Sequence, residues 1–190
     1  MTKARDLANG GFGLVLMKPS SVVNGTDNGK GTVTFSGVGT SGVSLNGVFN
    51  STYLNYRIVS NTTASGSTGY LNFRLRASNS DITASNYTNA SMQAPYATGG
   101  GLSNDPSGAS QSTWRNYGYI DSVQDYAVVQ DIFSPFATAW TSYVNLKARL
   151  EYGNEFASGV YKATTPADGF TFYPSSGTFS GSISVYGYNK

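Results

Sequence analysis

The chain contains no cysteine and no histidine among its 190 residues. Without cysteine it can form no disulfide bond, no thiolate metal site and no cysteine nucleophile. Without histidine it lacks the side chain that most often acts as a general base or binds zinc, and it can hold no Ser-His or Cys-His catalytic pair. Because these absences remove the most frequent catalytic and metal-binding sites, we predict a protein that is not an enzyme and needs no cofactor.

Charged side chains are also scarce. They make up 12% of the chain, with a formal net charge of +2, against roughly 25% charged residues in a typical soluble domain. Such weak charge gives no reason to expect nucleic acid or an anionic membrane as a partner. The longest apolar stretch, 14–17, is far shorter than the roughly 20 residues of a membrane span, and no signal-peptide pattern is present. We expect the protein to be made in the cytoplasm.

The chain is instead rich in serine, threonine and asparagine, with 23 glycines and 14 tyrosines. Its hydrophobic content of 39% is sufficient to drive folding. A chain of this length suits one domain with a genuine core, which we place at 21–190. Residues 1–20 contain a loose glycine-rich stretch, end near Pro19 and are too short to fold alone. We expect this segment to dock on the domain or to attach the protein to another chain.

Alternation with a period of two residues dominates the sequence, which predicts half-buried β-strands. It is clearest at 140–151, and it recurs at 70–77 and 179–188. One face of the first stretch holds Trp140, Ser142, Val144, Leu146, Ala148 and Leu150, and the other holds Thr141, Tyr143, Asn145, Lys147, Arg149 and Glu151. Further strands are expected at 32–36, 43–48, 53–60, 125–133, 156–163 and 169–173, with an irregular one near Tyr87 or Met92 inside the long segment 78–112.

Many short antiparallel strands with glycine-rich turns predict an all-β fold. The favoured form is an antiparallel two-sheet β-sandwich of jelly-roll or Greek-key type, and a closed barrel is the alternative. In this fold the apolar side chains should pack between the sheets, and hydroxyl and amide groups should coat the outside.

An enzyme without histidine and cysteine must use carboxylates, lysine, tyrosine or serine, and the few carboxylates can be considered one by one. Asp125 or Asp131 could lie near Glu151 if the strands that carry them are neighbours, and a glycosidase needs two carboxyl groups about 5–10 Å apart. The favoured interpretation is that these are exposed charges at strand ends, where they prevent edge-to-edge association. Asp121 and Asp125 could contribute to a calcium site with loop carbonyls, although no dense acidic loop is present. We therefore predict no metal site.

Trp114, Tyr117 and Tyr119 form the most suggestive aromatic group. Tyrosine and tryptophan on a weakly charged surface can stack on sugar rings or anchor a protein interface, which makes these three residues candidate contacts for a receptor or partner. The alternative is that they cover strand faces, because aromatic residues are good strand formers.

Several segments resemble a known class of protein. The stretches 47–59 (GVFNSTYLNYRIV), 71–77 (LNFRLRA) and 172–188 (FYPSSGTFSGSISVYGY) are similar to recurring segments of small β-sandwich domains in bacteriophage tail-fibre and other virion structural proteins. The opening 2–8 (TKARDLA) is similar to the amino-terminal segments of some marine phage fibre-like proteins. None of these is a catalytic motif, so the resemblance concerns fold and setting.

The resemblance implies a virion protein that is assembled in the host cytoplasm, such as a tail fibre, a head fibre or a capsid decoration protein, with a role in assembly and in host attachment. Its partners would be other virion proteins and a host surface glycan, and it would form a homo-oligomer such as a trimer. The implied attachment residues in the first segment are Lys3, Arg5, Leu7, Phe12 and Leu14. The segment 78–120 would be the variable, partner-facing surface. A carbohydrate-binding module or a small glycan-degrading enzyme is the alternative.

Overall fold

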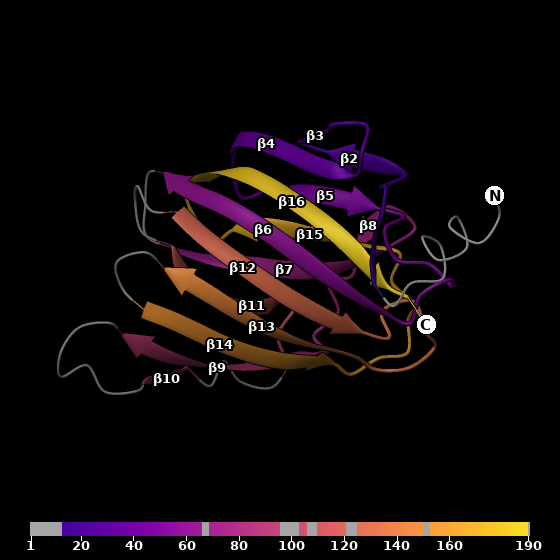
Figure 1. Ribbon diagram of the computed structural model, residues 1–190. Coiled ribbons are helices and arrows are strands. Elements are labelled where there is room, and N and C mark those ends of the chain that lie inside the picture. Colours follow the sequence, from indigo (N-terminus) through magenta and orange to yellow (C-terminus); the bar gives the residue numbers. More distant parts are fainter. Residues whose placement is uncertain are drawn as a thin grey trace.

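The protein is built entirely of β-strands in the part of the chain that the structure describes. The computed structural model describes residues 13–65, 69–95, 103–105, 110–120, 125–149 and 153–189. Their strands form two antiparallel sheets that lie face to face as two layers (Figure 1). This confirms the predicted all-β sandwich. Within the described ranges, no helix has the length and apolar character needed to cross a membrane.

The large sheet has ten strands, and its neighbours often come from distant parts of the sequence. In spatial order it contains β10 (Ser103–Asp105), β9 (Tyr87–Pro95), β14 (Gly153–Tyr161), β13 (Thr141–Arg149), β12 (Asp125–Phe133), β6 (Asn55–Ser65), β16 (Thr178–Tyr188), β4 (Thr32–Val38) and β3 (Thr26–Asp27), while β1 (Leu14–Leu16) pairs with β16. The carboxy-terminal strand β16 lies between β4 and β6 and also pairs with β1. Early and late parts of the chain therefore lie side by side in this sheet.

The small sheet has six strands and covers the inner face of the large one. In spatial order it contains β11 (Trp114–Ile120), β7 (Gly69–Ala77), β15 (Gly169–Pro174), β5 (Val43–Asn46) and β2 (Ser21–Val23), while β8 (Ser80–Asp81) pairs with β7. The expected strands all lie in or overlap observed ones, and β9 accounts for the irregular strand expected near Tyr87 or Met92.

The described part of the first segment belongs to the sandwich. Leu14 pairs with Tyr188 across β1 and β16, and the Met17 amide donates a hydrogen bond of 2.7 Å to the carbonyl oxygen of Val185. Met17 is a core residue. The folded domain therefore begins before residue 21, while residues 1–12 lie outside the described part of the chain.

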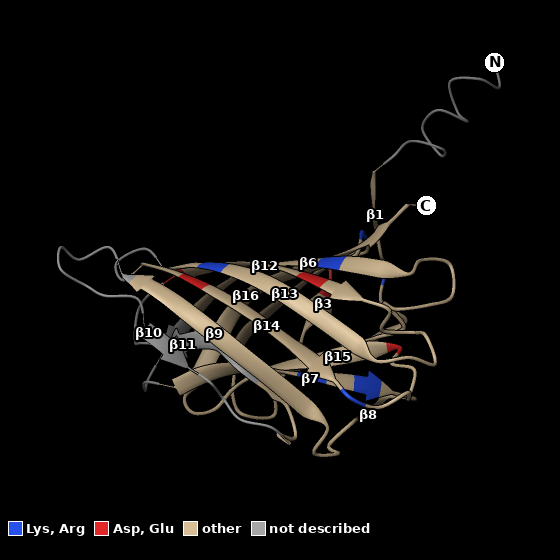
Figure 2. Ribbon diagram, turned by 90° about the horizontal axis from the view of Figure 1, so that it is seen from below, with Lys and Arg blue, Asp and Glu red and all other residues tan. Residues whose placement is uncertain are grey.

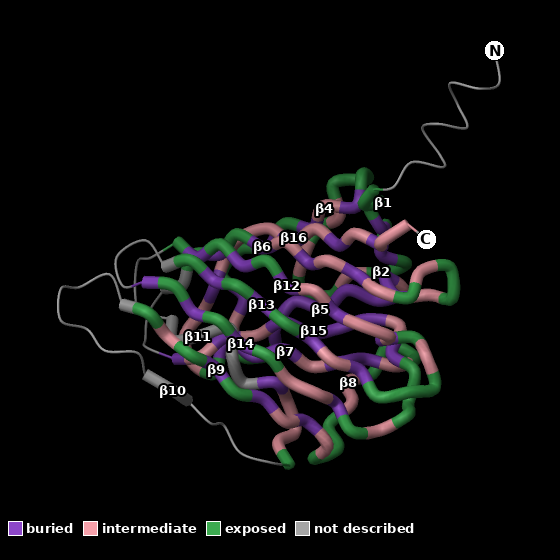
Figure 3. The backbone as a smooth tube through the Cα atoms, turned by 60° about the horizontal axis from the view of Figure 1, so that its bottom comes forward, coloured by how far each residue is buried: buried purple, intermediate pink, exposed green. Residues whose placement is uncertain are grey.

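Between the two sheets lies an aromatic core. Figure 3 marks the buried residues of both sheets along the backbone in purple. The Trp114 ring stacks on Phe73 at 5.8 Å, and Phe73 stacks on Phe170 at 4.7 Å. Tyr87 meets Trp114 edge-on at 5.3 Å. Rings from both sheets thus interlock across the sandwich, and their burial is the main apolar contribution to its stability.

On β13 the alternation is confirmed, but the expected orientation of its two faces is wrong. Tyr143 and Lys147 are buried, whereas Val144 and Leu146 face solvent. The reason lies in the aromatic rings of β12–β14: Tyr126, Tyr143 and Tyr161 all lie on the inner face and bury more apolar area there than valine, leucine and alanine would. The expectation of a uniformly polar outer surface therefore fails on this part of the large sheet.

Candidate functional site

A row of apolar side chains crosses the outer face of the large sheet. Each belongs to a neighbouring strand, because the registers pair Met92 with Phe156, Phe156 with Leu146, Leu146 with Val129, and Val129 with Val59. Leu146 is 51% exposed, Phe156 52% and Met92 44%. Neighbouring strands lie about 4.8 Å apart, so these five residues, the apolar band, extend over roughly 20 Å. A continuous exposed apolar row is unusual and indicates an interaction site.

The three most exposed residues of the apolar band have small or uncharged surroundings. Their flanking outward positions on the same strands are Val144, Ser158 and Ala90 on one side and Ala148, Asn154 and Ala94 on the other, whereas Val129 and Val59 are flanked on one side by the charged pair Asp131 and Arg57. Figure 2 shows how sparse the charged positions are over these strands. Apolar residues that include Met and Phe, in surroundings depleted of charge, are typical of the core of a protein–protein interface.

Three polar side chains form a hydrogen-bonded cluster beside this surface. Arg57 on β6 binds Asp131 on β12 in a two-pronged ion pair, with Nε–Oδ1 and Nη2–Oδ2 distances of 2.8 and 2.7 Å. The Tyr188 hydroxyl on β16 donates to Asp131 Oδ1 at 2.6 Å. All three side chains are half-buried. Their opposite charges neutralise each other, so the cluster adds no net charge to the face.

The same contacts determine how this cluster titrates. Partial burial raises the pKa of Asp131, but the hydrogen bonds from Arg57 and Tyr188 outweigh it, so the pKa of this carboxyl lies below its usual value. Burial, followed by the hydrogen bond to Asp131, raises the pKa of Tyr188 to about 12. With its oxygens bound by these partners, Asp131 is poorly placed to exchange protons with a substrate.

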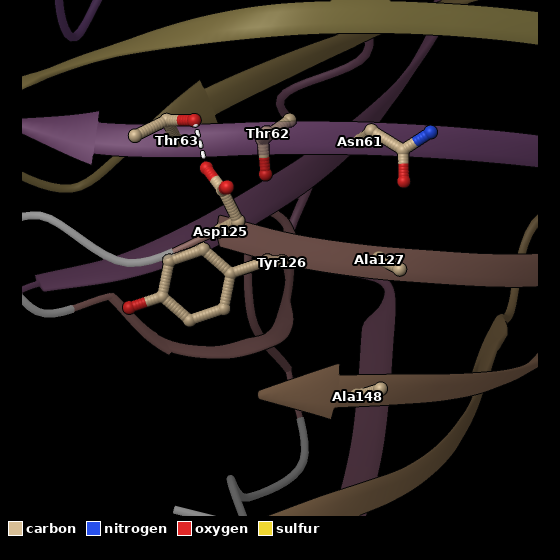
Figure 4. Close-up of a pocket in the computed structure, with 7 residues that line it drawn as sticks. All are labelled: Asn61, Thr62, Thr63, Asp125, Tyr126, Ala127 and Ala148. Atoms are coloured by element: carbon tan, nitrogen blue, oxygen red, sulfur yellow. Dashed lines mark hydrogen bonds between the residues drawn. The ribbon is translucent and has the colours of Figure 1, made fainter. Parts of the chain in front are cut away.

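An open hollow of about 400 Å³ lies at one end of β6, β12 and β13 (Figure 4). The exposed residues that line it are Asn61, Thr63, Asp125, Ala127 and Ala148. The Thr63 hydroxyl donates a hydrogen bond to Asp125, as Figure 4 shows. The hollow thus combines an amide, a hydroxyl and a carboxylate with two methyl groups, which suits the polar contacts of a small neutral ligand.

The candidate catalytic carboxylates do not gather into a pair that the structure describes. Asp125 and Asp131 lie on the outer face of β12, whereas Glu155 is buried on the inner face of β14. Asp121 and Glu151 lie outside the described residues, so the expected approach of Asp125 or Asp131 to Glu151 stays a prediction. Among the described residues, no group of three or more acidic side chains is arranged to hold a metal ion.

The aromatic candidates separate in the structure. Trp114 has no exposed surface, so the prediction that it contacts a receptor is wrong: its ring fills the space between the sheets, as the alternative interpretation expected. Tyr117 and Tyr119 have their backbones in β11, and their side chains lie outside the described part. Of the predicted attachment residues, Leu14 is exposed on β1, and Lys3, Arg5, Leu7 and Phe12 lie outside the described residues.

The apolar band itself was missed by reasoning from the sequence. A signal for it was available, because 125–129 and 143–146 carry apolar side chains at both alternating sets of positions. A strand that is apolar on both faces is typical of a sheet covered on both sides. In the structure only one of those faces is covered within the chain.

No protein-family model and no curated protein matches the chain. Among solved structures, the chain is similar to a galectin from Caenorhabditis elegans, with 11% sequence identity and a TM-score of 0.38 over 84% of this chain and 99% of the galectin. It is also similar to the marine PL-14 alginate lyase from Aplysia kurodai, with 8% identity and a TM-score of 0.32 over 92% of this chain and 98% of the lyase. At these identities the likeness concerns the all-β fold alone.

Proposed function

We propose that the protein is a structural component of a bacteriophage particle that docks on another virion protein through the apolar band. The observation that carries the docking role is the apolar row from Met92 to Val59, whose members from Met92 to Val129 are exposed in a charge-poor face. The virion setting is inferred from the resemblance of 47–59, 71–77 and 172–188 to phage fibre and virion domains. A tail fibre, a head fibre and a capsid decoration protein all fit this role.

The proposed partner presents an apolar surface that contacts the large sheet across several of its strands. Leu146 and Phe156 stand at the centre of the band and are its most exposed members. Side chains at the centre of an interface contribute most of the binding energy, typically more than about 2 kcal/mol for each strong anchor. A charge placed at either position would have to be desolvated on docking and would oppose it.

The experiment uses a phage that encodes this chain, with the gene deleted and supplied in trans. We expect Leu146→Asp and Phe156→Asp chains to fold but to be missing from purified particles, as detected by immunoblot. Thr34→Asp is the matched control, because Thr34 is exposed on β4 of the same sheet and away from the band. Absence of the wild-type chain from particles would refute the virion role, and normal incorporation of both band variants would refute docking through the band.

The amino-terminal segment has a separate proposed role as an anchor to the particle. Because β1 and Met17 belong to the sandwich, a deletion that tests this role should stop at residue 12. The shortened chain should keep its circular dichroism spectrum but fail to join particles. Normal incorporation would remove Lys3, Arg5, Leu7 and Phe12 from the attachment site.

A glycan-binding role is the second candidate, and the hollow beside Asn61 favours it. An amide, a hydroxyl and a carboxylate side by side can bond to sugar hydroxyls. Binding to a glycan array that is lost in Asn61→Ala would support this role, which also agrees with host attachment. Turnover of host polysaccharide that disappears in Asp125→Asn or Glu151→Gln would show an enzyme instead, and no turnover by the wild type would exclude that reading.

A further inference from the structure

Beneath the apolar band, on the inner face of the same strands, lies a buried pair of opposite charges. Lys147 on β13 and Glu155 on β14 are direct cross-strand neighbours, with Nζ 4.0 Å from Oε2, and their side chains are 1% and 3% exposed. Removing two charged groups from water costs free energy, and the attraction between Lys147 and Glu155 across 4.0 Å offsets only part of that cost. Transfer of the ammonium proton to the carboxylate removes both charges and leaves a neutral primary amine, which is a nucleophile.

The surroundings of the pair keep water away. Lys147 Nζ lies 4.5 Å from the centre of the Tyr126 ring, and the Tyr143 ring packs on Trp114 at 4.7 Å. Burial, with the nearby Glu155 charge, raises the pKa of Tyr143, so its hydroxyl keeps its proton. An amine held among rings in a dry interior is protected from protonation by solvent.

A primary amide lies on the neighbouring strand. Gln130 on β12 has no exposed surface, and neither its amide nitrogen nor its amide oxygen has a hydrogen-bond partner. The register pairs Val128 with Lys147, so Tyr126 and Gln130 are the two diagonal inner-face neighbours of Lys147. Diagonal neighbours are about 7–8 Å apart at the backbone, within reach of long side chains. Gln130 is therefore within reach of the Lys147 stem, on the side of Lys147 opposite the Tyr126 ring.

We propose that Lys147 and Gln130 form an intramolecular isopeptide bond, with Glu155 as the proton carrier. Lys147 gives one proton to Glu155, and its nitrogen lone pair attacks the amide carbon of Gln130 to form the new C–N bond. The tetrahedral intermediate collapses as a proton moves from the Lys147 nitrogen to the former amide nitrogen, and the old C–N bond breaks. Ammonia leaves and takes the proton from Glu155 as ammonium, which restores the carboxylate. No oxidant or other reactant is needed.

Asn145 and Gln93 are other amides near this pair, and the geometry favours Gln130 over both. Gln93 is the partner of Glu155 on β9 and lies two strands away from Lys147. The side-chain oxygen of Asn145 accepts a hydrogen bond of 3.1 Å from the Ala157 amide. Asn145 also lies on the same strand as Lys147, so a bond between them would tie β13 only to itself. A bond to Gln130 instead links β12 to β13, the strands that carry Val129 and Leu146. It would resist the separation of these strands under load.

Mass spectrometry of the purified full-length wild-type chain under denaturing conditions tests the proposal. The intact mass should be lower than the sequence mass by one molecule of ammonia, and the full sequence mass would overturn the proposal. Trypsin does not cleave after an acylated lysine, so the peptide 116–149 should remain uncut at Lys147. Because the bond closes a ring, breaking one backbone bond between Gln130 and Lys147 should release no fragment. Ammonia loss that maps to any other residue, Asn145 included, would overturn the assignment to Gln130.

Two variants test the role of Glu155. Glu155→Gln should retain the ammonia, because the carboxylate that accepts the Lys147 proton is removed. The control is Asp125→Asn, which changes a carboxylate on the outer face of β12 and should lose ammonia as completely as the wild type. Equal ammonia loss in both variants would overturn the role of Glu155. If Glu155→Gln does not fold, the wild-type mass alone decides whether the bond exists, and it does so independently of any docking role.

Discussion

Replacement of Trp114 by alanine should destabilise the fold severely. The indole has no exposed surface and contacts the rings of Phe73, Tyr87 and Tyr143 at centroid distances of 5.8, 5.3 and 4.7 Å. Truncation of a buried aromatic side chain to alanine costs about 3–5 kcal/mol. Because three aromatic contacts are lost together, we expect a value near the top, about 5 kcal/mol. For a chain of this size that corresponds to a decrease in Tm of roughly 10–20 °C.

Urea denaturation followed by far-UV circular dichroism measures this loss. Trp114→Phe is the matched control, because it keeps a ring in the core and removes an indole N–H that has no hydrogen-bond partner. We expect it to lose less than half as much stability as the alanine variant. If Trp114→Ala lowers the free energy of unfolding by less than about 1 kcal/mol, as surface substitutions do, the placement of Trp114 between the sheets is refuted.

Four further predictions concern other parts of the sandwich. Arg76→Leu should lower the free energy of unfolding by about 3 kcal/mol in urea titrations, because the guanidinium donates to five oxygens and its loss leaves Asp81 without its main partner; an unchanged midpoint would contradict this. The Asp131 contribution to stability should be present above pH about 4 and fade as the pH falls further, because its folded pKa is lowered. The Tyr188 contribution should be present below pH about 10 and fade from there to about 12, because its folded pKa is raised; Tyr188→Phe should lack this alkaline loss in midpoint-against-pH curves. Gly42→Ala should lower Tm, since φ is +72° and a Cβ would lie 2.7 Å from the Phe172 carbonyl oxygen; an unaltered Tm would be inconsistent with this turn.

The strands were predictable because alternation is a local property. Both ends of 125–133 and one end of 169–173 agree with the observed strands, since the period of two follows from backbone geometry alone. The order of the strands was not predictable in the same way. β6 pairs with both β12 and β16, which lie far along the chain, and these partners are selected by how the whole core packs.

The orientation of β13 shows a second limit of local pattern. One set of side chains contains Val144 and Leu146, and the other contains Tyr143 and Lys147. On a scale of residue hydrophobicity the first set belongs inside, yet the ring of Tyr143 and the stem of Lys147 bury well beside Tyr126. The neighbouring strands decide which set of side chains faces inward. They either supply contacts for the polar groups of that set or leave those groups buried without a partner. Places where a strand departs from its local pattern are often functional.

The edges of the large sheet explain why association should use its face. The outermost strands that the structure describes, β10 and β3, have three and two residues. Short edge strands offer few free backbone groups, which limits pairing with another chain along the edge. The apolar band, in contrast, crosses strands of nine to eleven residues and has few nearby charges to repel a partner. A molecule with short edges and an apolar face should associate through that face, so charge placed at Leu146 should disrupt assembly more than charge placed on β3.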